Sequence, residues 1–206
     1  MDQAKLILAS QSPRRAQLLR EDGYVFEQVM PPFTDPPQPC DPGDTSPDRL
    51  AVQLSIKKAL SVFIQLGSLE NETAVVLAAD TICLGVDQQL IGTPQSRHQA
   101  RGIIRGFVGQ THQVISAVAI IVGYGGDPVT LCDRATVAFG PLEENRLEAY
   151  LHSDQWRGKA GGYNLFDRLA QGWPITVTGD PTTVVGLPMR RLAPLLGRLG
   201  IINVDA

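Results

Sequence analysis

The sequence lacks the cysteine pattern of a disulfide-stabilised protein. Its 206 residues include three cysteines, Cys40, Cys83 and Cys132, and none of them forms a CxxC pair. An odd number of isolated cysteines argues against a disulfide framework. Because reduced thiols are typical of proteins inside the cell, we expect an intracellular protein.

Long apolar runs are also missing. No stretch approaches the roughly 20 consecutive apolar residues that a membrane-spanning helix requires. The N-terminal segment MDQAKLILAS has a single lysine and a very short apolar run, too short for the core of a signal peptide. We therefore expect a soluble cytoplasmic protein without a membrane partner.

Positive charge is not in excess. The chain has 18 Lys and Arg against 21 Asp and Glu, a formal net charge of −3. Proteins that bind duplex nucleic acid usually carry a basic field, so we expect no nucleic-acid partner. Any anion must instead meet a local cluster of cations. The 43% hydrophobic and 19% charged fractions are those of a globular protein long enough to bury a core.

Several catalytic motifs are absent. There is no GxxxxGK[ST] phosphate loop and no GxSxG nucleophile elbow. His98, His112 and His152 are scattered and form no HExxH motif. The glycines of Gly123–Gly126 precede no helical pattern, so they indicate a hairpin turn and not a dinucleotide-binding loop. P-loop enzymes, serine hydrolases of that type and zinc peptidases are thereby excluded.

The first positive signal is the segment LILASQSPRRAQLL (Leu6–Leu19). A short buried strand, Leu6–Ala9, leads through a turn to a helix, with Ser12 suited to the N-cap and Pro13 to the first helical position. We expect this helix to end near Asp22 and Gly23, since glycine commonly terminates helices.

Two arginines, Arg14 and Arg15, follow the helix cap directly. A helix N-terminus presents free N–H groups and partial positive charge, and guanidinium groups bind phosphate oxygens in a bidentate manner. This pattern favours a phosphate site. The alternative is a capped helix with two solvated arginines, which explains the serines and the proline but not why both charges follow the cap directly.

A second signal is Asp80, which directly follows the apolar run TAVVLAA (Thr73–Ala79). Such a run predicts a central buried strand. Ligands of open α/β sheets bind where strands end, and a carboxylate there can hold a hard divalent cation or act as a general base. A turn or helix-cap aspartate is the alternative, and the sequence does not separate the two.

Weaker signals occur in three other segments. RGKAGGYNL (Arg157–Leu165) combines cations with two adjacent glycines, where backbone can approach a ligand closely, or it is a flexible turn. Lys58 is a candidate cation, or a solvated helix lysine. The proline-rich segment Pro31–Asp48 is a long loop, either functional or, slightly favoured, a rigid spacer.

The remaining periodicity predicts a mixture of elements and not a strict βα alternation. We therefore expect an α/β fold with a mixed twisted sheet flanked by helices, as a single domain over residues 1–206. The predicted helices are Pro47–Phe63, Gln95–Phe107, Leu142–His152 and Met189–Arg198. The predicted strands are Tyr24–Met30, Ile82–Leu84, Gln89–Ile91, Gln113–Val122, Val129–Phe139, Ile175–Thr178 and one around Thr183–Val185.

Five motifs occur in the order seen in one known family: LASQSPRRAQLL, AADTICL, GQTHQVISAVAI, LEAYL with GKAGGY, and GDPTTVVGLP. The chain resembles the Maf family of nucleoside triphosphate pyrophosphatases from end to end. The resemblance implies an α/β fold with two lobes around a cleft, similar to the inosine-triphosphatase type, and a homodimer. It also implies hydrolysis of a nucleoside triphosphate to the monophosphate and pyrophosphate with Mg²⁺ or Mn²⁺, and a link to arrest of septum formation.

The resemblance also implies roles for particular residues. Asp80 matches the catalytic acid and a metal ligand, with Asp35 as the second metal ligand. Arg14 and Thr81 match positions that select the substrate. The matched phosphate-binding and substrate-binding positions are Ser10, Ser12, Arg15, Lys58 and Lys159.

Three departures from the family pattern are visible. The Gly-Lys-Pro turn of the family is here Gly92-Thr93-Pro94, its selectivity glutamine is replaced by Phe166, and its acidic pair is reduced to Thr34-Asp35. The SPRR segment and Thr81 favour dTTP or UTP, whereas Phe166 can stack on a base but cannot make the glutamine's hydrogen bonds. A nucleotide-binding regulator that has lost turnover is therefore the alternative to an enzyme.

Overall fold

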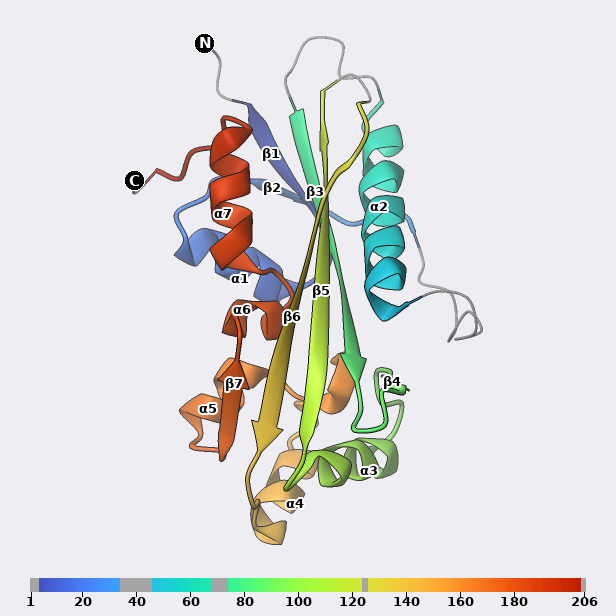
Figure 1. The fold of residues 1–206 in the computed structure, drawn as a ribbon, viewed down its shortest axis with the longest axis vertical. Coiled ribbons are helices and arrows are strands. Elements are labelled where there is room, and N and C mark those ends of the chain that lie inside the picture. The colour runs from blue at the N-terminus through green and yellow to red at the C-terminus, as the bar shows by residue number, and fades with distance from the viewer. Residues whose placement is uncertain (1–3, 34–45, 68–73, 124–125, 205–206) are drawn as a thin grey trace. The chain divides into compact units, whose positions relative to one another are not determined.

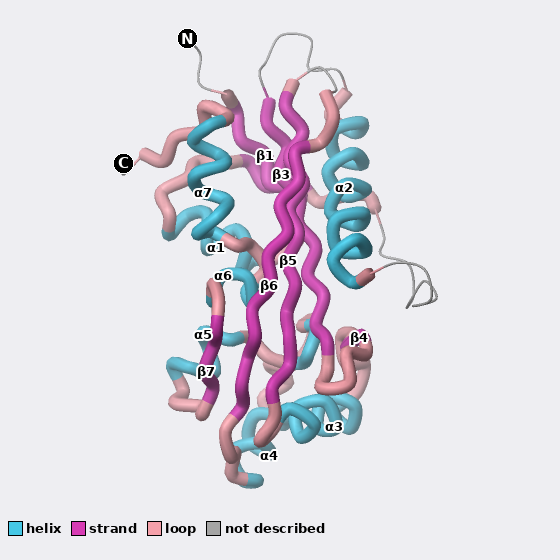
Figure 2. Tube along the Cα trace, in the orientation of Figure 1, coloured by secondary structure: helices cyan, strands magenta, loops and turns pink. Residues whose placement is uncertain are grey.

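The computed structural model describes residues 4–33, 46–67, 74–123 and 126–204. Within them the chain forms an α/β structure around one sheet (Figure 1, Figure 2). Asp35, and most of the proline-rich segment, fall outside the described residues. No helix in the described part of the chain is both long enough and apolar enough to cross a membrane.

The sheet has seven strands within the described residues, and its main path runs β2-β1-β3-β5-β6-β7 with β4 attached to β3. β1 is parallel to β2 and β3, whereas β4 is antiparallel to β3 and β7 to β6. The sheet is therefore mixed, as predicted. The strands are β1 (Lys5–Ala9), β2 (Glu27–Val29), β3 (Ala74–Leu84), β4 (Leu90–Ile91), β5 (Thr111–Val122), β6 (Val129–Phe139) and β7 (Ile175–Thr178).

Seven α-helices surround the strands within the described residues. They are α1 (Pro13–Glu21), α2 (Pro47–Gln65), α3 (Arg97–Phe107), α4 (Glu144–His152), α5 (Leu165–Ala170), α6 (Pro181–Val185) and α7 (Met189–Arg198), and a 3-10 turn, η1, covers Ala160–Gly162. Serine side chains cap α1, α2 and α3 by accepting a backbone N–H from the first turn. Such caps explain why these helix starts are visible in the sequence.

Two expectations need correction. The strand predicted around Thr183–Val185 is instead the short helix α6, because Asp180 accepts hydrogen bonds from the N–H and the hydroxyl of Thr182 and so starts a helical turn. The strand predicted to end at Ala79 continues to Leu84, since Cys83 and Leu84 pair with Ile91 and Leu90 of β4. Asp80 therefore lies inside β3 and not at its end.

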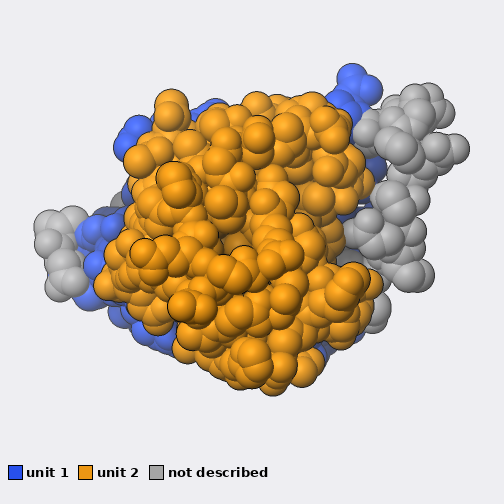
Figure 3. Space-filling view, turned by 90° about the horizontal axis from the view of Figure 1, so that it is seen from below, with its two compact units in different colours: residues 1–80, 116–133, 186–206 blue, residues 81–115, 134–185 orange. Residues whose placement is uncertain are grey.

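The described residues group into two compact units (Figure 3). Unit 1 contains Met1–Asp80, Ser116–Asp133 and Gly186–Ala206, and unit 2 contains Thr81–Ile115 and Arg134–Val185. Strands β3, β5 and β6 contribute residues to both.

In unit 1, alternate residues of the strands face opposite sides of the sheet. Ile7 and Ala9 of β1, with residues of β3 and β5, pack on Ala59 and Val62 of α2. The helices α1 and α7 lie on the other side of these strands (Figure 1). The sheet of unit 1 is thus covered on both faces, which explains why β3 is buried at every residue from Ala74 to Asp80.

The core of unit 2 is rich in aromatic residues. His112 stacks on Phe107 with ring centroids 3.8 Å apart, and its Nε2 lies 2.8 Å from the hydroxyl of Tyr163. Burial lowers the pKa of His112 to about 4 and raises the pKa of Tyr163 well above its ordinary value. His112 is therefore a neutral residue of the core.

Candidate functional site

The turn between β1 and α1 is held by its own serines. The hydroxyl of Ser12 accepts a hydrogen bond from the N–H of Arg15 at 3.4 Å, and the hydroxyl of Ser10 accepts one from the N–H of Ser12 at 3.1 Å. Ser10 also donates its N–H to Val29 of β2 at 3.1 Å. The strand, the turn and the first turn of α1 therefore form one hydrogen-bonded segment, as predicted.

Arg15 is not a solvated arginine. Its Nε donates to the carbonyl of Gly186 at 3.1 Å, and its Nη1 contacts the hydroxyl of Ser10 at 3.4 Å. These contacts fix the plane of the guanidinium beside the start of α1. Arg14, the preceding residue, is half-buried. The alternative of two solvated arginines is thus wrong for Arg15.

Lys58 and Asp80 form a buried ion pair. Nζ of Lys58, on α2, lies 2.5 Å from Oδ1 of Asp80, on β3, and the two side chains are 13% and 9% exposed. The neighbouring Lys57 is exposed. Burying two opposite charges is tolerated only when they are well paired. Lys58 is therefore not a solvated helix lysine, and Asp80 is not a turn aspartate.

A cavity of about 600 Å³ brings several of the candidate residues together. Its volume lies within the range usual for small-molecule sites, about 300–1,000 Å³. Arg15 and Lys58 supply two cations to its wall, and Ser10 and Ser12 supply hydroxyls. The lining residues are Ala9, Ser10, Gln11, Ser12, Arg15, Met30, Pro31, Pro32, Phe33 and Lys58.

The chemistry of this wall suits a phosphate chain. The partial positive charge at the start of α1 adds to the guanidinium and the ammonium. Asp80 forms an ion pair with Lys58, so a carboxylate lies next to this cation of the cavity wall. The arrangement can bind a polyanion and present a carboxylate beside it.

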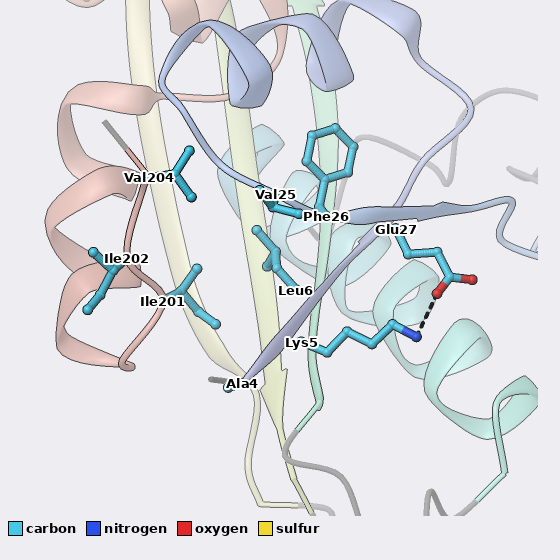
Figure 4. A pocket seen from close by; sticks show the side chains of 9 residues that line it. All are labelled: Ala4, Lys5, Leu6, Val25, Phe26, Glu27, Ile201, Ile202 and Val204. Carbon is cyan, nitrogen blue, oxygen red and sulfur yellow. Dashed lines mark ion pairs between the residues drawn. The ribbon is translucent and has the colours of Figure 1, made fainter. Parts of the chain in front are cut away.

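A second cavity, of about 470 Å³, has a different character (Figure 4). It is lined mainly by apolar side chains of β1, the Val25–Phe26 segment and the C-terminal Ile201, Ile202 and Val204. Its one cation, Lys5, forms an ion pair with Glu27 at 2.9 Å. This cavity is therefore not suited to a polyphosphate.

Arg14 belongs to unit 1 and is not among the residues that line the cavity, whereas Thr81, Lys159 and Phe166 belong to unit 2. Thr81 follows Asp80 on β3 and is half-buried, and Phe166 near the start of α5 is 39% exposed. The ammonium of Lys159 donates to the carbonyl of Gln155. The group around the cavity thus consists of Ser10, Ser12, Arg15 and Lys58, with Asp80 behind it.

The glycine-rich segment of unit 2 is a packed structure and not a flexible turn. Gly161 donates its N–H to the carbonyl of Gly92 at 3.2 Å, and the hydroxyl of Tyr150 donates to the carbonyl of Gly162 at 2.7 Å. Gly161 has a φ of 73°, and a Cβ there would lie 3.1 Å from the sulfur of Cys83. Lys159 is therefore presented by a fixed segment that contacts the turn containing Thr93.

Two supporting residues were missed from the sequence. Gln28 of β2 donates its Nε2 to the carbonyl of Ser10 at 2.8 Å, and Gly186 holds Arg15 through its carbonyl. Nothing in the pattern around Gln28 marks it. Gly186 lies in the motif GDPTTVVGLP, so the motif was visible although its contact with Arg15 was not.

A preformed metal site does not fit the described residues. They contain no group of three His, Cys, Asp or Glu side chains placed to hold an ion. One oxygen of Asp80 already bonds the ammonium of Lys58, the lysine that lines the cavity. Asp35, the other expected ligand, lies outside the described residues.

The fold and the cavity together define an α/β protein with a cationic, hydroxyl-lined anion site backed by a buried carboxylate. The family model described as Maf-like protein matches residues 5–199, and the chain belongs to this family.

Several related proteins align with nearly the whole chain. A protein named dTTP/UTP pyrophosphatase from Symbiobacterium thermophilum is 33% identical over 95% of this chain and 94% of its own length. Proteins of the same name from Brucella abortus and Hyphomonas neptunium are each 36% identical, over 94% and 96% of this chain and 91% and 96% of their own lengths. The resemblance found in the motifs is thus confirmed along the whole chain.

Proposed function

We propose that the protein is a nucleoside triphosphate pyrophosphatase that releases the nucleoside monophosphate and pyrophosphate. The observation that carries this proposal is a cavity lined by both Arg15 and Lys58, in which Lys58 forms an ion pair with the buried Asp80. The names of the relatives make dTTP and UTP the first substrates to test.

The start of α1 binds the phosphate chain in this proposal. Its partial positive charge attracts the phosphates, and the hydroxyls of Ser10 and Ser12 and the guanidinium of Arg15 donate hydrogen bonds to phosphate oxygens. Because the Ser10 hydroxyl and the Gly186 carbonyl already orient Arg15, little side-chain freedom is lost when the substrate binds.

Asp80 acts as the general base. Its carboxylate accepts a proton from a water molecule while the water oxygen attacks the α-phosphorus. The bond from the α-phosphorus to the oxygen bridging to the β-phosphorus then breaks, and pyrophosphate leaves. The ammonium of Lys58 stabilises the charge that develops on the phosphate oxygens.

A divalent cation, Mg²⁺ or Mn²⁺, is part of the proposal as a cofactor. When bound to a triphosphate, such an ion neutralises charge and polarises a phosphoryl oxygen. Since the described residues form no ready site for it, the steps above depend only on the side chains of the chain itself.

Base selection is assigned to residues that resemble the family's selectivity positions. These are Arg14, Thr81 and Phe166, of which Phe166 offers an exposed aromatic face. A ring can stack on a base without a hydrogen bond, so we expect Phe166 to tolerate more than one base.

The test is pyrophosphate release from a panel of common and modified nucleoside triphosphates, with Mg²⁺ and with Mn²⁺. We expect release that falls by at least about a hundredfold in Asp80→Asn, because a general base contributes about 10²–10⁴-fold. Absence of release from every nucleotide by folded, metal-supplied protein would overturn the proposal.

The competing hypothesis is a nucleotide-binding regulator without turnover. It is favoured by Thr93, since the turn there lacks the lysine of the family pattern. Saturable binding of nucleotide in calorimetry without product would support it. Turnover that disappears in Asp80→Asn would rule it out.

A further inference from the structure

Unit 2 buries an arginine that the proposed mechanism does not use. Arg168 is 1% exposed, and its guanidinium carbon lies 4.3 Å from the ring centroid of Tyr150 and 5.3 Å from that of Trp173. Its Nε has no hydrogen-bond partner among the described residues. Because a buried charge is costly when it is incompletely paired, packing alone would favour an apolar residue at this position.

The backbone of Arg168 is held on both sides. Its N–H donates to the carbonyl of Asn164 at 3.1 Å, and its carbonyl accepts the N–H of Trp173 at 2.9 Å. Helix α5, which carries Arg168, has six residues and no side-chain bond at its N-cap. Such a short helix depends on contacts with its surroundings, since it is not stable by itself. The guanidinium of Arg168 is therefore a fixed point in unit 2.

This guanidinium is joined to Lys159 through Gln155. Nη2 of Arg168 donates to Oε1 of Gln155 at 2.6 Å, and the ammonium of Lys159 donates to the backbone carbonyl of the same glutamine. The residue before Gln155, Asp154, has a φ of 55°, which is uncommon for a residue other than glycine. This turn thus carries one contact to the buried arginine and one to the candidate substrate-binding lysine.

We propose that Arg168 is a positioning residue for substrate binding, which acts through Gln155 to hold the ammonium of Lys159 in the orientation that binds the nucleotide. This inference rests on the proposed function. An ammonium has three N–H donors, so it can bond a carbonyl and phosphate oxygens at the same time. Ordering the long side chain of lysine before the substrate arrives reduces the entropy that is lost on binding.

The chemistry of the two linked groups suits this role. A guanidinium is planar, so its face stacks on aromatic rings while its edge donates hydrogen bonds. The amide of Gln155 accepts such a bond from Arg168 without carrying a charge. A carboxylate in its place would add a negative charge close to Lys159 and would oppose the binding of phosphates.

The first experiment measures binding of an α,β-methylene analogue of UTP by calorimetry, which needs no turnover, with Mg²⁺ supplied. Gln155→Leu should raise the Kd by roughly fivefold to tenfold, because the side chain of Lys159 must then be ordered when the nucleotide binds. Gln171→Leu, the same substitution at another exposed glutamine of unit 2, should leave the Kd unchanged. An unchanged Kd in Gln155→Leu would overturn the proposal.

A double-mutant cycle then shows whether Gln155 acts through Lys159. Lys159→Met should weaken nucleotide binding, and Gln155→Leu should add little to that loss, since the ammonium that Gln155 orients is already gone. A purely structural effect of Gln155→Leu would be the same with or without Lys159. Losses that multiply in the double variant, or no loss in Lys159→Met, would therefore contradict the proposal.

Arg168→Met tests the buried cation itself. The Kd should rise as in Gln155→Leu, and combining the two substitutions should not raise it further, whereas an unchanged Kd would count against Arg168. Arg101→Met breaks the ion pair of Arg101 with Glu148, another contact of unit 2, and should lower stability without changing the Kd.

Circular dichroism establishes that each variant is folded. Arg168→Lys, which keeps the charge but not the planar group, replaces Arg168→Met if that variant does not fold. The positioning role and the proposed function fail differently. Absence of pyrophosphate release together with the expected Kd values would overturn the enzyme and keep the positioning of Lys159. Release together with an unchanged Kd in Gln155→Leu would do the reverse.

Discussion

The guanidinium of Arg15 donates its Nε hydrogen to the carbonyl of Gly186, 171 residues further along the chain, at 3.1 Å. This bond joins the two ends of unit 1: the first helix, and the segment that leads into the last one. The start of α1 therefore carries an arginine whose guanidinium is held in place by a distant part of the chain.

Arg15→Lys should raise the KM for nucleotide by about tenfold or more while kcat changes less. Lysine keeps the charge but cannot bond Gly186 and a phosphate oxygen through one planar group. Steady-state kinetics of pyrophosphate release measure this. Arg20→Lys is the matched control, because Arg20 is on the same helix and its guanidinium packs over the ring of Phe26 away from the cavity residues. Equal effects of both substitutions would contradict the role given to Arg15.

Gly186→Ala should destabilise the protein by about 1–3 kcal/mol, because an L-residue is strained at positive φ. Gly186 has a φ of 118°. Urea unfolding measures the loss, and kinetics should show a raised KM through the displaced carbonyl. Gly102→Ala is the control, since Gly102 lies in helix α3 with open space around it and alanine favours helix. An unchanged free energy of unfolding and an unchanged KM in Gly186→Ala would show that the carbonyl can move without cost.

Stability should fall as the pH is lowered from about 6.5 to about 4, because His112 has a pKa of about 4 in the folded protein against 6.5 as its ordinary value. The unfolded chain binds the proton in this range and the folded protein does not, so acid favours unfolding, by about 3 kcal/mol in full. Well above pH 6.5 His112 is neutral in both the folded and the unfolded protein, so it no longer makes the free energy of unfolding depend on pH.

The variant His112→Gln tests the assignment to His112. Glutamine can still hydrogen-bond Tyr163 but does not titrate, so the pH dependence of urea unfolding should shrink. His98→Gln is the control, since His98 is exposed. An unchanged pH dependence in His112→Gln would assign the effect to other groups.

Thr93→Lys should lower the KM for nucleoside triphosphates about threefold to tenfold, because it restores an ammonium on the turn that contacts the Lys159 segment. Thr93 is exposed, so the larger side chain meets no core atoms. Kinetics on dTTP and UTP give the measurement. Thr93→Gln matches the size without the charge and should have no such effect. The same gain in both variants would show that charge is not the cause.

Much of the fold could be predicted because it depends on neighbouring residues. Ser12 and Pro13 start α1 through hydrogen bonds within one turn of helix, and glycines or apolar periodicity mark the ends of elements such as β6 and α7. The segment Thr183–Val185 was predicted wrongly because its β-branched residues favour a strand, whereas the side chain of Asp180 starts a helical turn. There a local capping contact outweighed intrinsic propensity.

The candidate site likewise has features that the local sequence shows and features that depend on distant contacts. The sequence by itself determined which residue types are available: the serines and arginines at the start of α1, the acid in β3 and the lysine in α2. Only the tertiary structure decided their pairing, since Lys58 and Asp80 are 22 residues apart and Arg15 and Gly186 are 171 apart. Contacts over such separations depend on how strands and helices pack, and side-chain periodicity specifies a buried face without specifying which distant group it meets.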